Sequence, residues 1–171
     1  MVRLVDLLEK LKTTPVDLRV LEKKLPKNCR AIQYKSLKGK HRSEVFKGVE
    51  ALVVHVPKRD SKVGHFIALI PRKHHIEYFS SLGGSAESEL NKLGESLAVM
   101  KALLGENYIY NSVALQSGKY NINSCASWVL CRLYLRKLKL RQFTNIFNSK
   151  TTLQNSDDIA AIMSLLLLFD V

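Results

Sequence analysis

Three apolar, β-branched segments follow one another closely in the first half of the chain, and they limit the folds that it can adopt. The first covers residues 50–57, where Pro57 ends it, and the next two cover residues 65–70 and 75–80. Runs of this kind, bounded by proline and basic turns, are typical of β-strands. The short connection over residues 71–74 predicts that the last two strands form an antiparallel hairpin. We therefore expect a sheet at the centre of the fold.

Helical patterns lie before and after these strands. Leucines at positions 4, 7, 8 and 11 predict an amphipathic first helix, and Thr14-Pro15 predicts the cap and first turn of a second helix that extends to about residue 24. One apolar face predicts a long helix over residues 86–104. A further helix is expected from Cys125 to about residue 140, with one or two more before the end of the sequence.

Two other segments, residues 30–38 and 108–115, have strand character. The sequence shows no internal repeat, low-complexity stretch or obvious linker. Residues 1–171 are therefore expected to form a single α+β domain, with a central mixed or antiparallel sheet flanked by helices.

The chain carries a strong positive charge. Its 171 residues include 27 Lys and Arg against 15 Asp and Glu, which gives a net charge of +12 and a pI of about 9.7. A field of this sign favours polyanions, so nucleic acid is the first expected partner and an acidic membrane surface the second. The candidate phosphate-contacting residues are Lys35, Lys38, Lys40, Arg42, Lys47, Lys58, Arg59, Lys62, Arg132, Arg136, Lys137, Lys139 and Arg141.

The cysteines and the apolar runs argue against other classes of protein. Cys29, Cys125 and Cys131 are an odd number of cysteines without a repeated CxxC motif, so we expect neither a disulfide framework nor a zinc site. Such sparse cysteines predict a reducing, intracellular compartment. No secretory signal is evident at the start of the sequence. The longest apolar run, residues 159–169, is shorter than the roughly 20 residues that a membrane span needs. It predicts a buried terminal helix.

Cys125 is the residue that most clearly suggests chemistry. Asn123-Ser124 precedes it as a cap-type pair, and the apolar run that begins with Ala126 follows it. A cysteine at a helix N-terminus lies beside unpaired backbone N–H groups and the positive end of the helix dipole, which stabilise a thiolate. We therefore expect Cys125 to be a nucleophile with a lowered pKa, and Cys131 to be a buried core thiol.

Two upstream residues complete a nucleophilic site. His65 begins an apolar strand after a basic loop, where an imidazole can reach a cleft and act as a general base, although a lone histidine at a strand edge is common. Gln116 precedes a polar loop and can donate its amide N–H, together with the backbone N–H of Cys125, to an oxyanion. Asn121 and Asn123 are alternative donors.

The order His65, then Ser80 within Tyr-Phe-Ser-Ser-Leu-Gly, then Gln116 and Cys125 resembles the adenovirus-type cysteine protease superfamily. That superfamily includes adenain-like maturation proteases of viruses and the proteases that remove SUMO and other ubiquitin-like proteins. The resemblance covers roughly residues 60–140. It implies a papain-like α+β fold and peptide-bond hydrolysis through an acyl-enzyme, with no metal and no obligatory cofactor beyond DNA or an activating peptide.

The sequence departs from the pattern of that superfamily at several positions. Ser80 stands where the superfamily has an acidic residue, so we expect a Cys–His dyad in which the serine orients His65 weakly. Glu77 is close in sequence, but in a regular strand it points to the opposite face from Ser80. The spacing from Gln116 to Cys125 is longer than usual, and Ala126 replaces a common glycine.

These features favour a viral cysteine endopeptidase that cleaves capsid or core precursor proteins during virion maturation. In this hypothesis the enzyme works in an infected cell or inside the particle, with DNA as a sequence-independent partner. A protease that deconjugates ubiquitin-like proteins is the alternative. A non-catalytic, basic, nucleic-acid-binding virion protein on a decayed protease scaffold is the alternative of another class. The sequence does not indicate an oligomeric state.

Overall fold

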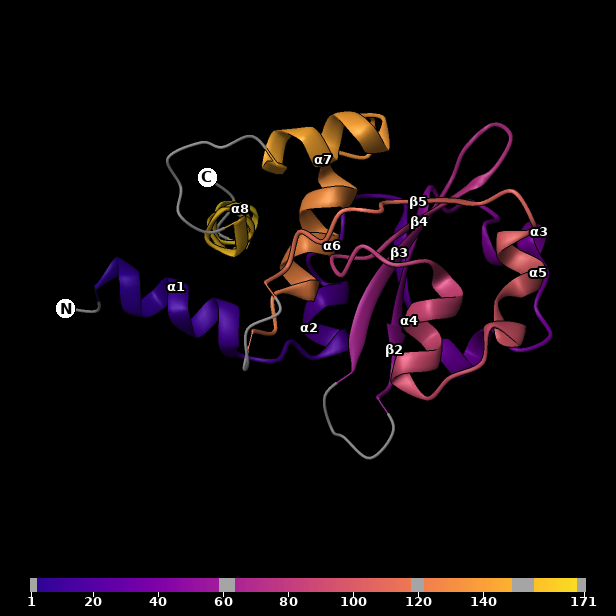
Figure 1. Cartoon of the computed structure of the whole chain (residues 1–171), viewed down its shortest axis with the longest axis horizontal. Coiled ribbons are helices and arrows are strands. Elements are labelled where there is room, and N and C mark those ends of the chain that lie inside the picture. The colour runs from indigo at the N-terminus through magenta and orange to yellow at the C-terminus, as the bar shows by residue number, and fades with distance from the viewer. Residues whose placement is uncertain (1–2, 59–63, 118–121, 149–155, 169–171) are drawn as a thin grey trace.

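The computed structural model describes residues 3–58, 64–117, 122–148 and 156–168. Its centre is a five-stranded mixed sheet in the order β1-β2-β3-β4-β5 (Figure 1). The strands are β1 (Cys29–Gln33), β2 (Ala51–Val56), β3 (His65–Pro71), β4 (Ile76–Phe79) and β5 (Ile109–Tyr110). The predicted β3–β4 hairpin is antiparallel, as is the β2–β3 pair, whereas β1 and β5 pair in parallel with their neighbours. The expected α+β class is confirmed.

Helices cover both faces of this sheet. The helical elements are α1 (Leu4–Thr13), α2 (Leu18–Glu22), η1 (Tyr34–Leu37), α3 (Arg42–Val45), α4 (Ala86–Leu93), η2 (Leu97–Val99), α5 (Lys101–Leu104), α6 (Cys125–Tyr134), α7 (Leu140–Asn148) and α8 (Ser156–Leu168). In Figure 1, α6 lies between the sheet and the α1, α7 and α8 helices, while α4 and α5 lie on the other side of the strands. No helix in the described ranges is long and apolar enough to cross a membrane.

Alternation along β2 and β3 divides the core into two layers. Phe66 and Ala68 pack with Trp128 and Val129 of α6 on one face, and Ile67 and Leu69 pack with Leu90 of α4 on the other. Successive side chains of a strand point to opposite faces, so two neighbouring residues at one end of β3 serve different layers. Because of this alternation, His65 and Phe66 point to opposite faces of the sheet, and both belong to the candidate site described below.

Several predicted boundaries are wrong. The long helix expected over residues 86–104 ends at Leu93, because Gly94 adopts a left-handed conformation with φ of 80° and terminates it. Residues 97–104 continue as the short η2 and α5. The second helix starts at Leu18 rather than at Pro15, since the Asp17 carboxylate accepts a hydrogen bond from the Arg19 N–H.

Other segments are shorter than the sequence predicts. The strand expected over residues 30–38 turns into η1 after Gln33, and the one expected over residues 108–115 pairs only at Ile109–Tyr110. The helix that begins at Cys125 ends at Tyr134, and α7 starts separately at Leu140. Hydrophobic periodicity alone does not show where backbone pairing stops.

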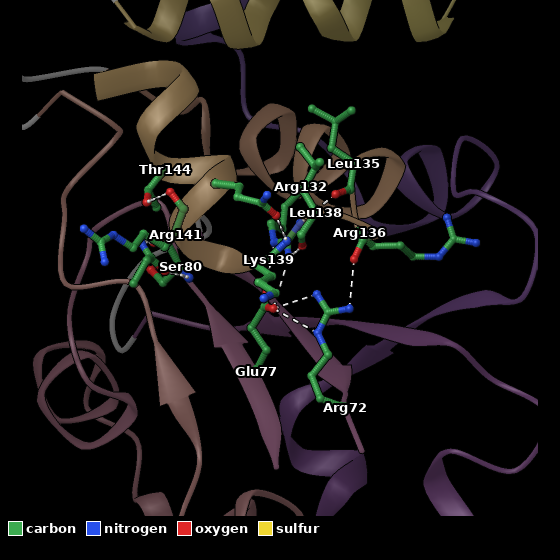
Figure 2. Close-up of polar contacts among 12 residues, drawn as sticks. Arg72, Glu77, Ser80, Arg132, Leu135, Arg136, Leu138, Lys139, Arg141 and Thr144 are labelled. Atoms are coloured by element: carbon green, nitrogen blue, oxygen red, sulfur yellow. Dashed lines mark hydrogen bonds and ion pairs between the residues drawn. The ribbon is translucent and has the colours of Figure 1, made fainter. Parts of the chain in front are cut away.

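A buried ion-pair cluster joins α6 to the sheet (Figure 2). Arg132 is fully buried and donates two hydrogen bonds to Glu77 of β4, at 2.6 and 2.9 Å. Arg72 donates to the same carboxylate and to the Arg136 carbonyl oxygen. The remaining Arg132 donors reach the carbonyl oxygens of Leu135 and Leu138, just beyond α6. Glu77 therefore faces α6 and away from Ser80, as its spacing in the strand predicts.

The Glu77→Gln variant is expected to lower the free energy of unfolding by about 3–5 kcal/mol, because it leaves the Arg132 guanidinium buried without a counter-charge. Urea denaturation followed by circular dichroism measures this loss. Glu50→Gln is the matched control: Glu50 pairs with Arg136 at an exposed position, where solvent screens the ion pair, so its loss is expected to change stability far less. Equal losses of unfolding free energy in the two variants would contradict the role of Glu77 as the buried counter-charge of Arg132.

Candidate active site

Cys125 is the first residue of α6, as the sequence predicts. Ser124 is the N-cap residue, but its hydroxyl does not cap the helix and donates instead to the Asp157 carboxylate. Trp128 Nε1 and the Ser117 backbone N–H also donate to Asp157, at 3.0 and 2.8 Å. The start of α6 is therefore held from α8, by a fully buried carboxylate with three donors.

The Cys125 thiol is buried between α6 and the start of β3. Cys125 is 7% exposed, and the backbone N–H groups of Phe66, Ala126 and Cys125 itself lie near enough to its sulfur to affect its pKa. These N–H groups lower the pKa of the thiol, but burial has the larger effect and raises it above its usual value. The lowered pKa expected from the helix N-terminus is therefore wrong for this closed arrangement, because loss of hydration outweighs the amide dipoles.

His65 is buried at the start of β3, next to Phe66. Its Nε2 lies 2.9 Å from the Ser80 hydroxyl, and Ser80 Oγ also accepts a hydrogen bond from the Leu82 backbone N–H. Burial, together with the charge of His55, lowers the pKa of His65 from 6.5 to about 4. The imidazole is therefore neutral at pH 7, with Ser80 in the position that the sequence assigned to it.

The thiol and the imidazole both lie near the start of β3. The thiol contacts the Phe66 amide, whereas His65 extends from the preceding position and shares a sheet face with Ile67. Within the described residues, no hydrogen bond joins His65 to Cys125. With Nε2 directed at Ser80, Nδ1 is the ring nitrogen left to accept a proton from a thiol. The raised pKa of Cys125 and the lowered pKa of His65 both favour the neutral forms of the two groups at pH 7.

Gln116 is not directed at Cys125. Its Nε2 donates to the Ile122 carbonyl oxygen at 3.0 Å, and its Oε1 accepts from the Ser81 hydroxyl at 2.7 Å. Both ends of the amide are thus engaged in holding the loop that leads to α6. The Cys125 backbone N–H is one of three backbone N–H groups that act on the thiol, and Asn121 lies outside the described residues.

A small pocket lies over the thiol and brings in a residue that the sequence did not single out. It has a volume of about 40 Å³ and is lined by Pro15, Val16, His55, Gly64, Phe66, Asn123 and Cys125. His55 Nδ1 lies 2.9 Å from Gln33 Oε1, and its ring packs on Phe66. In the sequence, His55 lies in a valine-rich strand that gives no reason to select it as a site residue. In the structure, His55 of β2 pairs opposite Phe66 of β3, and this pairing places it at the pocket over the thiol.

The segment between α1 and α2 closes this pocket. Pro15 and Val16 line it, and Asn123 binds the last turn of α1, directly before this segment. The Asn123 backbone N–H donates to the Lys12 carbonyl oxygen, and Asn123 Nδ2 donates to the Thr13 carbonyl oxygen at 2.8 Å. The enclosed volume holds a few water molecules but no polypeptide segment.

The proposed phosphate-contacting set changes in the structure. Arg132 does not belong to it, because its guanidinium is fully buried against Glu77. Arg136 pairs with Glu50, and Lys40 with Glu44. Arg59 and Lys62 lie outside the described residues. DNA binding by the other members of the set stays a prediction. The described residues contain no cluster of three or more His, Cys, Asp or Glu side chains that could hold a metal ion.

No known family model and no curated protein matches this chain. Among solved structures, the chain is similar to the central domain of an uncharacterized protein from Legionella pneumophila, with 11% identity, 92% of this chain and 99% of that chain covered, and a TM-score of 0.47. It is also similar to the C-terminal Ulp1 protease domain in complex with Smt3, the yeast ortholog of SUMO, with 14% identity, coverages of 96% and 76%, and a TM-score of 0.41.

A third likeness is to SUMO protease Ulp1 with its catalytic cysteine oxidized to a sulfinic acid. Its identity is 16%, its coverages are 96% and 76%, and its TM-score is 0.37. Similarities this low assign no activity. The functional argument therefore rests on the geometry of the site.

The low pKa of His65 predicts how stability depends on pH. Between pH 6.5 and about 4 the unfolded chain binds a proton at this residue and the folded protein does not. Its contribution is fully present above pH 6.5 and is lost as the pH falls to about 4, by about 3 kcal/mol. Urea denaturation at pH 7 and pH 4 is therefore expected to show a smaller acid-induced loss for His65→Gln than for the unmodified protein. Identical losses would contradict the burial of a neutral imidazole.

Proposed function

We propose that the protein is a cysteine peptidase in which Cys125 is the nucleophile and His65 the general base. One observation carries this proposal: the thiol at the start of α6 lies near Phe66 of β3, the residue that follows a buried histidine whose Nε2 lies 2.9 Å from Ser80 Oγ. Nucleophile, base and orienting group thus occur in series, which is the arrangement that activates a thiol.

The chemistry follows from these groups. Cys125 Sγ attacks the carbonyl carbon of a peptide bond, the thiol proton passes to His65 Nδ1, and the carbonyl electron pair moves to the oxygen. Collapse of this intermediate breaks the C–N bond, and the proton leaves with the amine. Water then hydrolyses the thioester and regenerates the thiol with release of a carboxylic acid. The Cys125 backbone N–H is the donor proposed for the oxyanion.

The proposed substrate is a polypeptide that enters beside α6. An apolar groove of about 460 Å³ lies between α1, α2 and α6, and it shares Pro15 and Val16 with the pocket over the thiol. Its lining includes Leu11, Val20 and Leu130. These surfaces suit the apolar side chains of a peptide that displaces the 13–17 segment.

The finer hypothesis is cleavage of capsid or core precursors, in a particle where DNA guides a protein of charge +12. Incubation with precursor proteins tests it, and incubation with ubiquitin-like precursors tests the deconjugating alternative. Cleavage of the ubiquitin-like precursors alone would favour the deconjugating alternative over the capsid-maturation hypothesis.

Cys125→Ala is expected to abolish labelling by a peptide chloromethyl ketone or vinyl sulfone, and with it peptide hydrolysis, because no other group attacks the carbonyl. His65→Gln is expected to reduce hydrolysis by at least about 100-fold, the usual range for loss of a general base. Mass spectrometry locates the label, and a fluorogenic peptide assay gives the rates.

Cys131→Ala and His55→Gln are the matched controls for this experiment. Cys131 is buried in the core with a pKa raised to about 12, and His55 is the other imidazole at the pocket. Both variants are expected to keep labelling of Cys125. Labelling of Cys131 instead, or a requirement for His55 rather than His65, would overturn the assignment.

Access to the thiol is expected to depend on the 13–17 segment. Asn123→Ala removes the side-chain hydrogen bond to Thr13, which is worth about 1 kcal/mol, so the open population and the rate of iodoacetamide labelling rise about fivefold. Intact-mass kinetics at pH 7 measure this rate. The exposed Asn91→Ala variant is the control and is expected to label at the unmodified rate. A slower Asn123→Ala variant would show that the segment does not limit access.

A further inference from the structure

The pocket over the thiol is lined by a histidine other than the proposed general base. His55 lies on β2 directly opposite Phe66 of β3, and its ring packs on the Phe66 ring with the two centroids 4.8 Å apart. His55, Phe66 and Cys125 all line this pocket, and His65 is not among the described residues that do. The role of a second imidazole beside the nucleophile therefore needs a separate account.

The ring of His55 is oriented by Gln33 of β1. Its Nδ1 lies 2.9 Å from Gln33 Oε1, which can only accept, so Nδ1 carries the proton of the neutral ring. Nε2 then holds a lone pair, and none of the described residues forms a hydrogen bond with it. Burial lowers the pKa of His55 from its ordinary value, although the charge of Asp17 acts in the opposite direction. The imidazole is therefore a neutral base at pH 7.

Gly64 leaves the space that this nitrogen occupies. A Cβ atom at Gly64 would lie 2.3 Å from His55 Nε2 and 2.5 Å from the Val56 carbonyl oxygen, so a larger residue would displace the ring or the strand. Gly64 itself lines the pocket. His55 Nε2 therefore lies next to Gly64 at the wall of the pocket, with no side chain between them.

The pocket has room for a water molecule. Its volume of about 40 Å³ exceeds the roughly 10–15 Å³ that one water needs. Polar groups of His55, Asn123 and Cys125 line it, which matches the two to four partners that hold a buried water. Pro15 and Val16 belong to the segment that a substrate displaces, so these three polar residues stay beside the thiol when a peptide is bound.

We propose that His55 is the general base of the hydrolytic half-reaction, in which water releases the acyl group from Cys125. This inference rests on the proposed function, because the thioester must form first. The water oxygen attacks the thioester carbonyl carbon while one of its protons passes to His55 Nε2. The C–S bond then breaks, the carboxylic acid leaves, and His55 returns the proton to the Cys125 sulfur. His65 thus serves acylation and His55 serves deacylation.

Hydrolysis of a peptide p-nitrophenyl ester separates the two half-reactions, since the initial burst of nitrophenol reports acylation and the later linear rate reports deacylation. His55→Gln is expected to keep the burst and to reduce the linear rate at least about 100-fold, the usual range for loss of a general base. Mass spectrometry is expected to show the acyl group accumulating on Cys125. His74→Gln changes an exposed histidine in the turn between β3 and β4, and this control is expected to keep both phases.

Chemical rescue distinguishes a base from a packing residue. His55→Ala leaves a cavity in place of the ring, and added imidazole is expected to restore its linear rate while leaving that of the unmodified protein unchanged. A loss that imidazole does not restore would mark a purely structural role for the ring and overturn the proposal. A linear rate that stays the same in His55→Gln would overturn it as well.

A second measurement reads the ring without turnover. In ¹⁵N-histidine NMR of the unmodified protein at pH 7, His55 is expected as the Nδ1–H tautomer, with Nε2 free to accept a proton. Gln33→Leu is expected to raise the Nε2–H fraction and to slow the linear phase about fivefold, the effect of losing one hydrogen bond of about 1 kcal/mol. An Nε2–H tautomer in the unmodified protein would overturn the proposal.

Failure of the proposed function gives a different result. An unmodified protein that shows no burst and no acylated Cys125 would refute the proposed function itself. A burst followed by a linear rate that does not depend on His55 would overturn only the role of His55. Irreversible labelling of Cys125 ends before the hydrolytic step, so His55→Gln is expected to keep it.

Discussion

The position of the Cys125 thiol depends on the contact between the first turn of α6 and the backbone at the start of β3. The sulfur there meets the Phe66 N–H as well as the N–H groups of its own helix. Burial that creates this contact also removes water from the thiol and from His65, so both groups are held in their neutral forms. One packing arrangement therefore sets the geometry of the site and its resting protonation state.

Charges near the site are separated by the sheet. Glu77 faces α6 and binds Arg132 and Arg72, so it anchors the helix that carries Cys125. Glu89 lies on the other face, where it binds the Tyr78 hydroxyl. The alternation of β4 thus gives each face of the sheet its own buried carboxylate.

The sequence predicted the parts of this molecule that depend on local patterns. Apolar, β-branched runs located β2, β3 and β4, and the cap-type pair before Cys125 located the start of α6. Helix ends were less predictable, since the break at Gly94 depends on where α4 and α5 pack. Residue order also placed His65 and Ser80 correctly beside each other, whereas the side-chain amide of Gln116 turned out to hold its own loop.

The residues that were missed act through tertiary contacts. His55 reaches the thiol pocket only because β2 and β3 pair in one register, and Glu89 reaches Tyr78 of β4 only because α4 lies beside that strand. Neither residue lies in a motif that marks it. The raised pKa of Cys125 was likewise unpredictable. The sequence indicates that the thiol lies beside the backbone amides of a helix N-terminus, but it does not indicate how far burial removes water from the thiol.

Asp157 gives the site a dependence on the order of synthesis. It lies 33 positions after Ser124 and binds Ser117, Ser124 and Trp128 around the start of α6. A nascent chain that has not yet extended through α8 contains Cys125, His65 and Ser80 but lacks the carboxylate that fixes the nucleophile's helix. The start of α6 gains this carboxylate only when α8 folds back onto the rest of the chain.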